Sequence, residues 1–212
     1  MPSAATTLGL PSTALVNRTM PKKAFYEHLE VSAKIKEQFV HAIERIELIG
    51  CLKESSIHIP AGEKVAEIDV LGIYLKEERS AVVPEAAIDL IARSIPNKLF
   101  FVCFNRDNSK FLIRRDKLYE AQWMPQGEVH LELTGSTLDE IWGSLCSQVV
   151  FNDADPSDFD ERLRRSNELA SLRRQLEKLQ KKRRAEKQIG RRNALWDEIK
   201  SIENSIIELE AR

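Results

Sequence analysis

Two apolar heptad seams near the C-terminal end of the chain constrain the fold more than any other feature. Leucines make the first seam and mainly isoleucines make the second, and both alternate three- and four-residue steps. This spacing is typical of the a and d positions of a coiled coil. In chain order, the seams consist of Leu169, Leu172, Leu176 and Leu179, and of Leu195, Ile199, Ile202, Ile206 and Leu209.

The two seams are out of phase, and this excludes one continuous helix with a single apolar stripe. Extension of the first seam would place Arg183, Glu186 and Gly190 in the helix interface. Two antiparallel helices joined near Gln188–Arg192, with Gly190 at the bend, satisfy both seams. Because short helices have little stability alone, they must pair with each other or with a partner. The seams therefore predict a coiled-coil helical arm over residues 156–212, with its hairpin formed within one chain or between two.

The residues before this arm alternate between helical and strand periods. A helix is predicted over residues 21–49, because apolar residues between Ile35 and Ile49 recur every three or four positions and Gly50 follows as a cap. The remaining segments are assigned by period, composition and bounding Pro or Gly residues. Further helices are predicted over residues 84–95 and 137–150, and strands over residues 57–59, 65–78, 99–105, 110–115 and 127–135.

This mixed order of elements predicts an α+β domain over residues 21–152, with a mixed sheet of about five strands flanked by helices. Residues 1–20 contain Pro2, Gly9 and Pro11 and show no sustained period. They are expected to form an extended N-terminal arm. The whole chain would then be this arm, the α+β domain and the coiled-coil helical arm.

Composition and motifs argue against several classes of protein. Lys and Arg number 32 against 33 Asp and Glu, so any charged interface must come from local clustering. The cysteines, Cys51, Cys103 and Cys146, form no CxxC pair, and neither a disulfide framework nor a zinc knuckle is expected. No P-loop, GxGxxG or HExxH motif is present, so no cofactor and no metal is expected. No run approaches the roughly 20 apolar residues of a membrane span, and a cytoplasmic protein without membrane contacts is expected.

An acidic pair in the long predicted strand, Glu67 and Asp69, is the main catalytic candidate. The two side chains share one face, because side chains alternate along a strand. With Lys76 and the order of helices and strands, the pair resembles the core of restriction-type nucleases, which hold a metal between Asp and Glu and place a Lys two residues after the Glu. Lys76 instead lies an odd number of residues from both acids, so it points to the other face unless a bulge intervenes. For Glu67 and Asp69, a salt bridge or a solvated strand end is therefore favoured over catalysis. The sequence as a whole favours a protein that is not an enzyme.

A basic stretch separates the two seams. It holds seven basic residues with Glu186 as its one acid, and such clusters can neutralise nucleic-acid phosphates. The alternative is a solvated end of the coiled coil whose charges pair with acids of a neighbouring chain. The basic residues are Lys181, Lys182, Arg183, Arg184, Lys187, Arg191 and Arg192.

Short motifs spread over residues 8–150 resemble one bacterial family, the domain of unknown function 4391 family. The best matches are Leu10-Pro11, Val16-Asn17, Pro21-Lys22, Glu67-Ile68 and Lys76. One segment departs from the family pattern, because KFLIRR stands where a strand like alanine-tyrosine-lysine is expected. The resemblance implies an uncharacterised protein whose relatives accompany helicases and DNA methyltransferases in restriction-like and antiphage gene clusters.

Three functions follow from these observations. The first is a non-catalytic adaptor subunit of a bacterial DNA-targeting defence assembly, which contacts a helicase or a DNA methyltransferase and, through the coiled coil, a second copy of itself. The second is a metal-dependent nuclease that uses Glu67 and Asp69. The third is a DNA-binding module that uses the basic stretch.

Overall fold

A computed structural model describes residues 8–27, 31–76 and 82–211. The chain forms two compact units, residues 1–157 and residues 158–212. The first unit is an α+β domain built on a mixed sheet, and the second is a pair of long helices.

A seven-stranded sheet organises the first unit, with the order β1-β2-β3-β4-β5-β6 and with β7 paired to β5. Strands β3 and β4 pair in parallel, and the other pairs are antiparallel. The mixed sheet with helices confirms the predicted α+β class, although the described residues form seven strands where about five were expected. The strands are β1 (Leu15–Met20), β2 (Ile43–Leu52), β3 (Ile68–Leu75), β4 (Lys98–Phe104), β5 (Asn108–Arg114), β6 (Leu118–Glu120) and β7 (Met124–Pro125).

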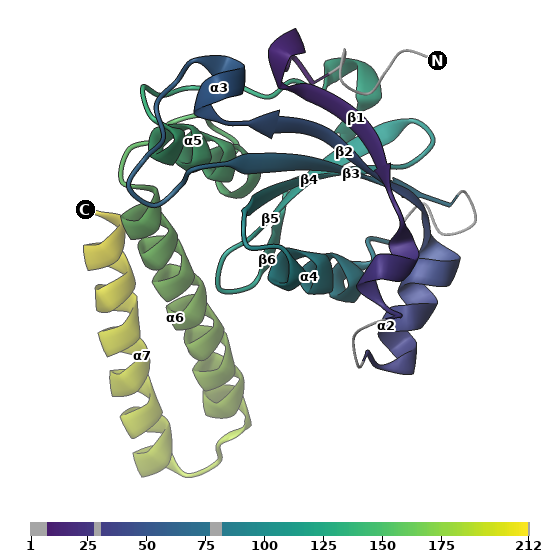
Figure 1. Ribbon diagram of the computed structural model, residues 1–212. Helices are drawn as coiled ribbons and strands as arrows, with labels where there is room; N and C mark the ends of the chain where they lie inside the picture. The colour runs from purple at the N-terminus through teal and green to yellow at the C-terminus, as the bar shows by residue number, and fades with distance from the viewer. Residues whose placement is uncertain (1–7, 28–30, 77–81, 212) are drawn as a thin grey trace. The chain divides into compact units, whose positions relative to one another are not determined.

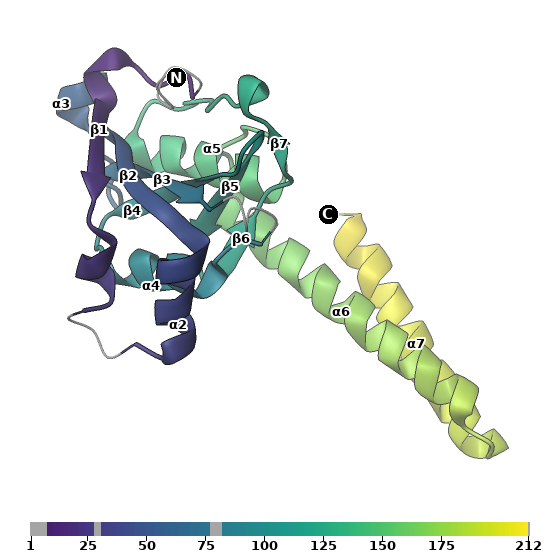
Figure 2. The same cartoon turned by 90° about the vertical axis from the view of Figure 1, so that its right-hand side faces the viewer.

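Helices cover both faces of the sheet. In Figures 1 and 2, α2 and α4 lie on one face and α5 lies on the other. Because β3 and β4 are parallel, the chain must cross over between them, and α4 makes this crossover. The helical elements are η1 (Ser12–Ala14), η2 (Lys22–Phe25), α2 (Ala33–Glu37), the π-helical turn η3 (Gln38–Ala42), α3 (Glu54–Ile57), α4 (Glu85–Ser94), η5 (Gln126–Glu128) and α5 (Leu138–Val150).

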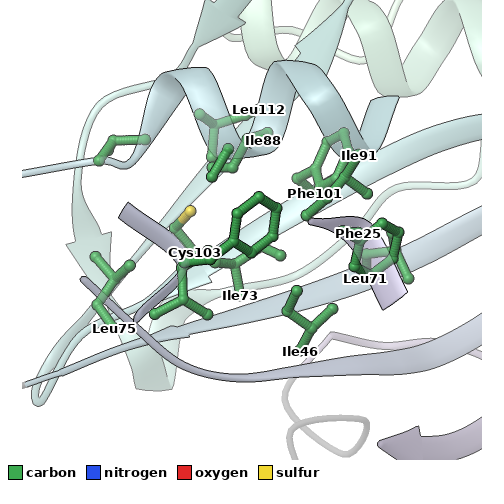
Figure 3. Packing of buried hydrophobic residues seen from close by; sticks show 14 of the residues in the cluster. Phe25, Ile46, Leu71, Ile73, Leu75, Ile88, Ile91, Phe101, Cys103 and Leu112 are labelled. Carbon is green, nitrogen blue, oxygen red and sulfur yellow. The ribbon is translucent and has the colours of Figure 1, made fainter. Parts of the chain in front are cut away.

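One apolar core lies between the sheet and α4. Phe101 of the central strand β4 is fully buried and lies among side chains from both layers (Figure 3). Ile46 and Ile73 reach it from β2 and β3, and Ile88 and Ile91 reach it from α4. Alternation along each strand directs these residues to one face, where they exclude water together.

The helix predicted over residues 21–49 is wrong beyond residue 42, where β2 begins at Ile43. Among the described residues of this range, helical structure covers Lys22–Phe25, as the 3-10 turn η2, and Ala33–Ala42, as α2 and η3. Residues 28–30 lie outside the described residues. Two register shifts in β2 explain the error, because each adds a residue that has no partner on β3. Ile43 and Ile46 therefore face the same core although they are three residues apart, a spacing that resembles a helical period. Ile49 lies after them on the opposite face of the sheet. Its side chain packs against Gly72 there, because a Cβ atom added to Gly72 would lie 2.9 Å from Ile49 Cδ1.

Two short predicted strands are also absent. Residues 54–57 form helix α3, and His58 ends it in the left-handed conformation with φ 57°. Residues 127–135 form no strand, although Val129 and Leu131 are buried as their alternation suggested. The Leu131 amide donates a hydrogen bond to the Leu8 carbonyl at 2.9 Å, so this segment contacts the N-terminal region instead of joining the sheet.

The other predicted elements are confirmed. The long strand is β3, the helix after Pro84 is α4, and the hairpin of apolar strands is β4 with β5. Residues 77–78, at the end of the predicted long strand, and residues 1–7 of the expected arm lie outside the described residues. Helix α5 begins after Thr137, whose side chain accepts a hydrogen bond from the Glu140 amide as an N-cap. Residues 15–20, within the expected extended arm, are the edge strand β1.

The second unit is the predicted helical hairpin, made of α6 (Phe159–Ala185) and α7 (Ile189–Glu210). The turn is Glu186–Gln188, and Gly190 lies in the first turn of α7 instead of at the bend. The seam closes within one chain, because Leu195 and Ile199 are only 5% and 1% exposed. The remaining seam residues are half-buried.

Candidate functional site

A polar cluster lies on the α4 face of the sheet, at the edge where β3 and β4 begin and β2 ends. Glu67 precedes β3 directly, Asp69 is the second residue of β3, and Asn97 precedes β4. Cys51 of β2 is the Cα partner of Asp69 in the antiparallel register. Because β3 and β4 run parallel, their first residues lie at the same edge, and this brings four residues from three segments together.

Short polar contacts join the four side chains. The Cys51 thiol donates to Glu67 Oε1 at 3.1 Å. The Asn97 amide nitrogen donates to Glu67 Oε1 at 3.2 Å and to Asp69 Oδ2 at 3.0 Å. One ligand atom from each of Cys51, Glu67 and Asp69 lies within 4.8 Å of the others. The amide thus holds two carboxylates close to each other and close to a thiol.

Burial dominates the electrostatics of this cluster. Asp69 is 9% exposed, and its burial raises the pKa of its carboxyl. The hydrogen bond from Asn97 lowers that pKa, whereas the nearby charge of Glu67 raises it. Burial, followed by the contact with Glu67, raises the pKa of the Cys51 thiol to about 12. The thiol is therefore protonated at neutral pH, as its role as a hydrogen-bond donor requires.

This set of side chains offers metal-ligand chemistry. Two carboxylates can bind a divalent cation, whose charge would reduce the repulsion between them. A thiol loses its proton when it binds a borderline or soft metal such as Zn²⁺. Within the described ranges, Cys51, Glu67 and Asp69 form the one group of three such side chains that lie this close together.

Lys76 does not join the acidic pair. It follows the last residue of β3, seven residues beyond Asp69, and extended backbone of that length spans about 23 Å. Its ammonium group donates to the carbonyl of Val40, within η3, at 2.8 Å. Lys22 donates to the nearby Ile43 carbonyl at 2.6 Å. Burial lowers the pKa of Lys22, and the charge of Lys76 lowers it further. Both lysines thus satisfy main-chain carbonyls where the helical segment changes into β2.

The sequence identified only half of the polar cluster. The shared face of Glu67 and Asp69 followed from strand alternation, but the positions of Cys51 and Asn97 depend on pairing between strands that are distant in sequence. The one available signal was the position of Asn97 directly before an apolar strand, since polar residues at parallel strand ends often gather at one sheet edge.

The basic stretch occupies the turn of the hairpin and the helix ends beside it. Arg183 is half-buried, and its guanidinium carbon lies 4.3 Å from the centroid of the Trp196 ring. Lys200 approaches the same ring, with Nζ 4.8 Å from the centroid. Lys181 pairs with Glu177 at 2.6 Å. The other five basic residues are exposed, and they are Lys182, Arg184, Lys187, Arg191 and Arg192.

The raised pKa of Asp69 makes stability depend on pH in a defined direction. The folded protein holds this proton more tightly than the unfolded chain, so stability falls as pH rises from about 4 through the folded pKa. Asp69→Asn removes the buried charge and keeps the shape. We expect the variant to gain stability relative to the unsubstituted protein across this pH range, measured as the urea midpoint from pH 3 to 8. A stability difference that does not change with pH would contradict the buried, destabilising carboxylate.

Among the described helices, none combines the length and the apolar character needed to cross a membrane. No curated protein and no solved structure matches this chain. The profile of one family, Domain of unknown function (DUF4391), matches residues 8–206. This match extends beyond the expected residues 8–150 and includes most of the helical hairpin. The chain belongs to the DUF4391 family.

Proposed function

We propose that the protein is a non-catalytic accessory subunit of a bacterial DNA-targeting defence assembly, and that the α6–α7 hairpin is its main protein-contact surface. The observation that carries this proposal is the closure of the hairpin seam within one chain. Helices of 27 and 22 residues form a unit of their own. Many of their residues outside the seam are exposed. A preformed helical surface costs little conformational entropy when a partner binds.

The partner class comes from the resemblance to the family. Relatives accompany helicases and DNA methyltransferases in restriction-like and antiphage gene clusters, and these enzymes act on DNA in the cytoplasm. An accessory subunit in the same compartment would connect such an enzyme to another component.

The adaptor proposal predicts that partner capture depends on an intact hairpin. Ile199→Asp places an unpaired charge in the seam and should open the hairpin, because buried charge without a partner is costly. Ser201→Asp, two residues along α7 at an exposed position, is the matched control. Affinity purification from the native host with mass spectrometry should recover a helicase or methyltransferase with the control and lose it with Ile199→Asp. Equal recovery with both variants would argue against the hairpin as the contact surface.

A second candidate function is a metal-dependent nuclease, favoured by the cluster of Cys51, Glu67 and Asp69. Its acids lie at the start of a central strand, next to a parallel strand, where two carboxylates could hold Mg²⁺ or Mn²⁺. The restriction-type core needs a lysine close to the two acids, and Lys76 lies far from them. We therefore consider the nuclease a weaker candidate than the adaptor.

The nuclease candidate predicts cleavage of DNA in the presence of Mg²⁺ or Mn²⁺ that Asp69→Asn abolishes. Lys76→Ala is a matched control, because Lys76 lies at the other end of β3 and should leave cleavage unchanged. The assay follows supercoiled and linear DNA by gel electrophoresis, with and without the native partners. DNA that remains intact after prolonged incubation under all of these conditions would exclude this candidate.

A third candidate is direct DNA binding through the exposed part of the basic stretch. Lys182→Gln with Arg184→Gln removes two exposed charges, whereas Arg183 is engaged with Trp196. We expect weaker binding and a decrease of about 2 in the salt dependence of log K, measured by fluorescence anisotropy over a salt series. Lys34→Gln with Lys36→Gln removes two exposed charges from the α+β domain as a control. An equal loss in both variants would show that the basic stretch is not the DNA contact.

A further inference from the structure

One side of α7, beside the seam, carries a line of exposed apolar side chains. Ile189 is 74% exposed, Trp196 is 40% exposed and Ile207 is 63% exposed. Ile189 and Ile207 are 18 residues apart, which is five turns of an α-helix, and Trp196 lies about two turns from Ile189. The three side chains therefore share one stripe of α7.

This stripe stands out from the rest of the described surface. The other large apolar side chains that are strongly exposed, Val16, Val40 and Val82, lie singly on β1, on η3 and in the segment before α4. Single exposed apolar residues are ordinary on protein surfaces, whereas an aligned set on one helix indicates a contact surface.

The charges along α7 change sign from one end of the helix to the other. Residues 181–192, at the turn and the start of α7, hold seven basic residues and one acid. Residues 197–210, at the other end of α7, hold five acids and one lysine. This order opposes the helix macrodipole, which favours acids at the N-terminal end and bases at the C-terminal end. At the basic end, helix α6 does not relieve the conflict, because its last turn is also basic. At the acidic end, Arg173 of α6 pairs with Glu210 at 2.7 Å and offsets part of the negative charge.

The apolar stripe and the charge order fit one partner, a helix that carries the same features in the opposite direction. We propose that a second copy of this chain packs its own α7 antiparallel against this face and forms a two-fold symmetric dimer. Ile189 of each copy then faces Ile207 of the other. Arg192 and Glu203 lie on one flank of the stripe about three turns apart, so each Arg192 comes beside Glu203 of the second copy.

The charge order along α7 favours an antiparallel second copy over a parallel copy or a nucleic acid. A parallel pair would bring basic end against basic end and acidic end against acidic end, which is repulsive. A nucleic acid would be attracted by the basic end but repelled by the acidic end, and it would leave the isoleucines exposed. Arg183 and Lys200 flank the Trp196 ring within α6 and α7, so this part of the face is already fixed before the second copy arrives.

Sedimentation equilibrium of the full-length protein, purified without any partner, tests the dimer. The unsubstituted chain should dimerise, and Ile189→Lys with Ile207→Lys should raise the dimer dissociation constant roughly tenfold or more, because both symmetry-related contacts between Ile189 and Ile207 are lost. Lysine preserves helix propensity at these exposed positions, and circular dichroism should remain unchanged. Val82→Lys, at an exposed apolar position in the other unit, is the matched control and should dimerise normally. A monomeric unsubstituted protein, or a double variant that dimerises as tightly, would overturn the proposal.

Disulfide trapping tests the antiparallel direction. The native thiols, Cys51, Cys103 and Cys146, are buried, so introduced surface cysteines should react first. A mixture of Ile189→Cys and Ile207→Cys chains with different tags should give a crosslinked heterodimer, and each variant alone should give little. Crosslinking of each variant with itself would indicate a parallel pair and would overturn the proposal. Because both measurements use purified protein, their outcome is independent of whether a helicase or methyltransferase binds the hairpin.

Discussion

The parallel pairing of β3 with β4 is the constraint on which the rest of the α+β domain depends. It requires the crossover helix α4, and this helix supplies Ile88 and Ile91 to the core around Phe101. The same pairing brings the first residues of two strands to one sheet edge, so that Asn97 can hold the carboxylates of Glu67 and Asp69. Core and polar cluster thus share one cause, and a shift in this register would disturb both.

The polar cluster also shows how a domain can retain an unfavourable charge. Burial of Asp69 beside Glu67 opposes ionisation, and the amide of Asn97 offsets only part of that cost. Polar groups of this kind are expensive unless they serve a purpose, and perturbed carboxyls gather at functional sites. Cys51, once deprotonated by a bound cation, would complete a ligand set with the two carboxylates. Lys76 instead donates to a main-chain carbonyl at the far end of the same strand.

The hairpin divides its two faces between two tasks. Its inner face closes the seam through Leu195 and Ile199, and this contact gives the unit its own stability. Another side of α7 keeps Ile189 and Ile207 exposed to solvent. The basic and acidic residues along α7 are ordered so that they oppose the dipole of that helix. An antiparallel second copy would cover the exposed isoleucines and pair the opposite charges of the two α7 helices. It would also place two α+β domains in one assembly. The proposed adaptor would then present its partners in pairs.

Elements whose signal lies in neighbouring residues could be predicted from the sequence alone. The out-of-phase seams required a helical hairpin, and the apolar runs correctly identified β3, β4 and β5. The other features depend on contacts between segments that are distant in sequence. Bulges in β2 let Ile43 and Ile46 share a face at a helix-like spacing, and nothing local distinguishes that strand from a helix. Likewise, Cys51 and Asn97 meet Glu67 and Asp69 only through strand pairing. The physical reason is that periodicity reports which side chains share a face, whereas register between distant strands is set by the packing of the whole core.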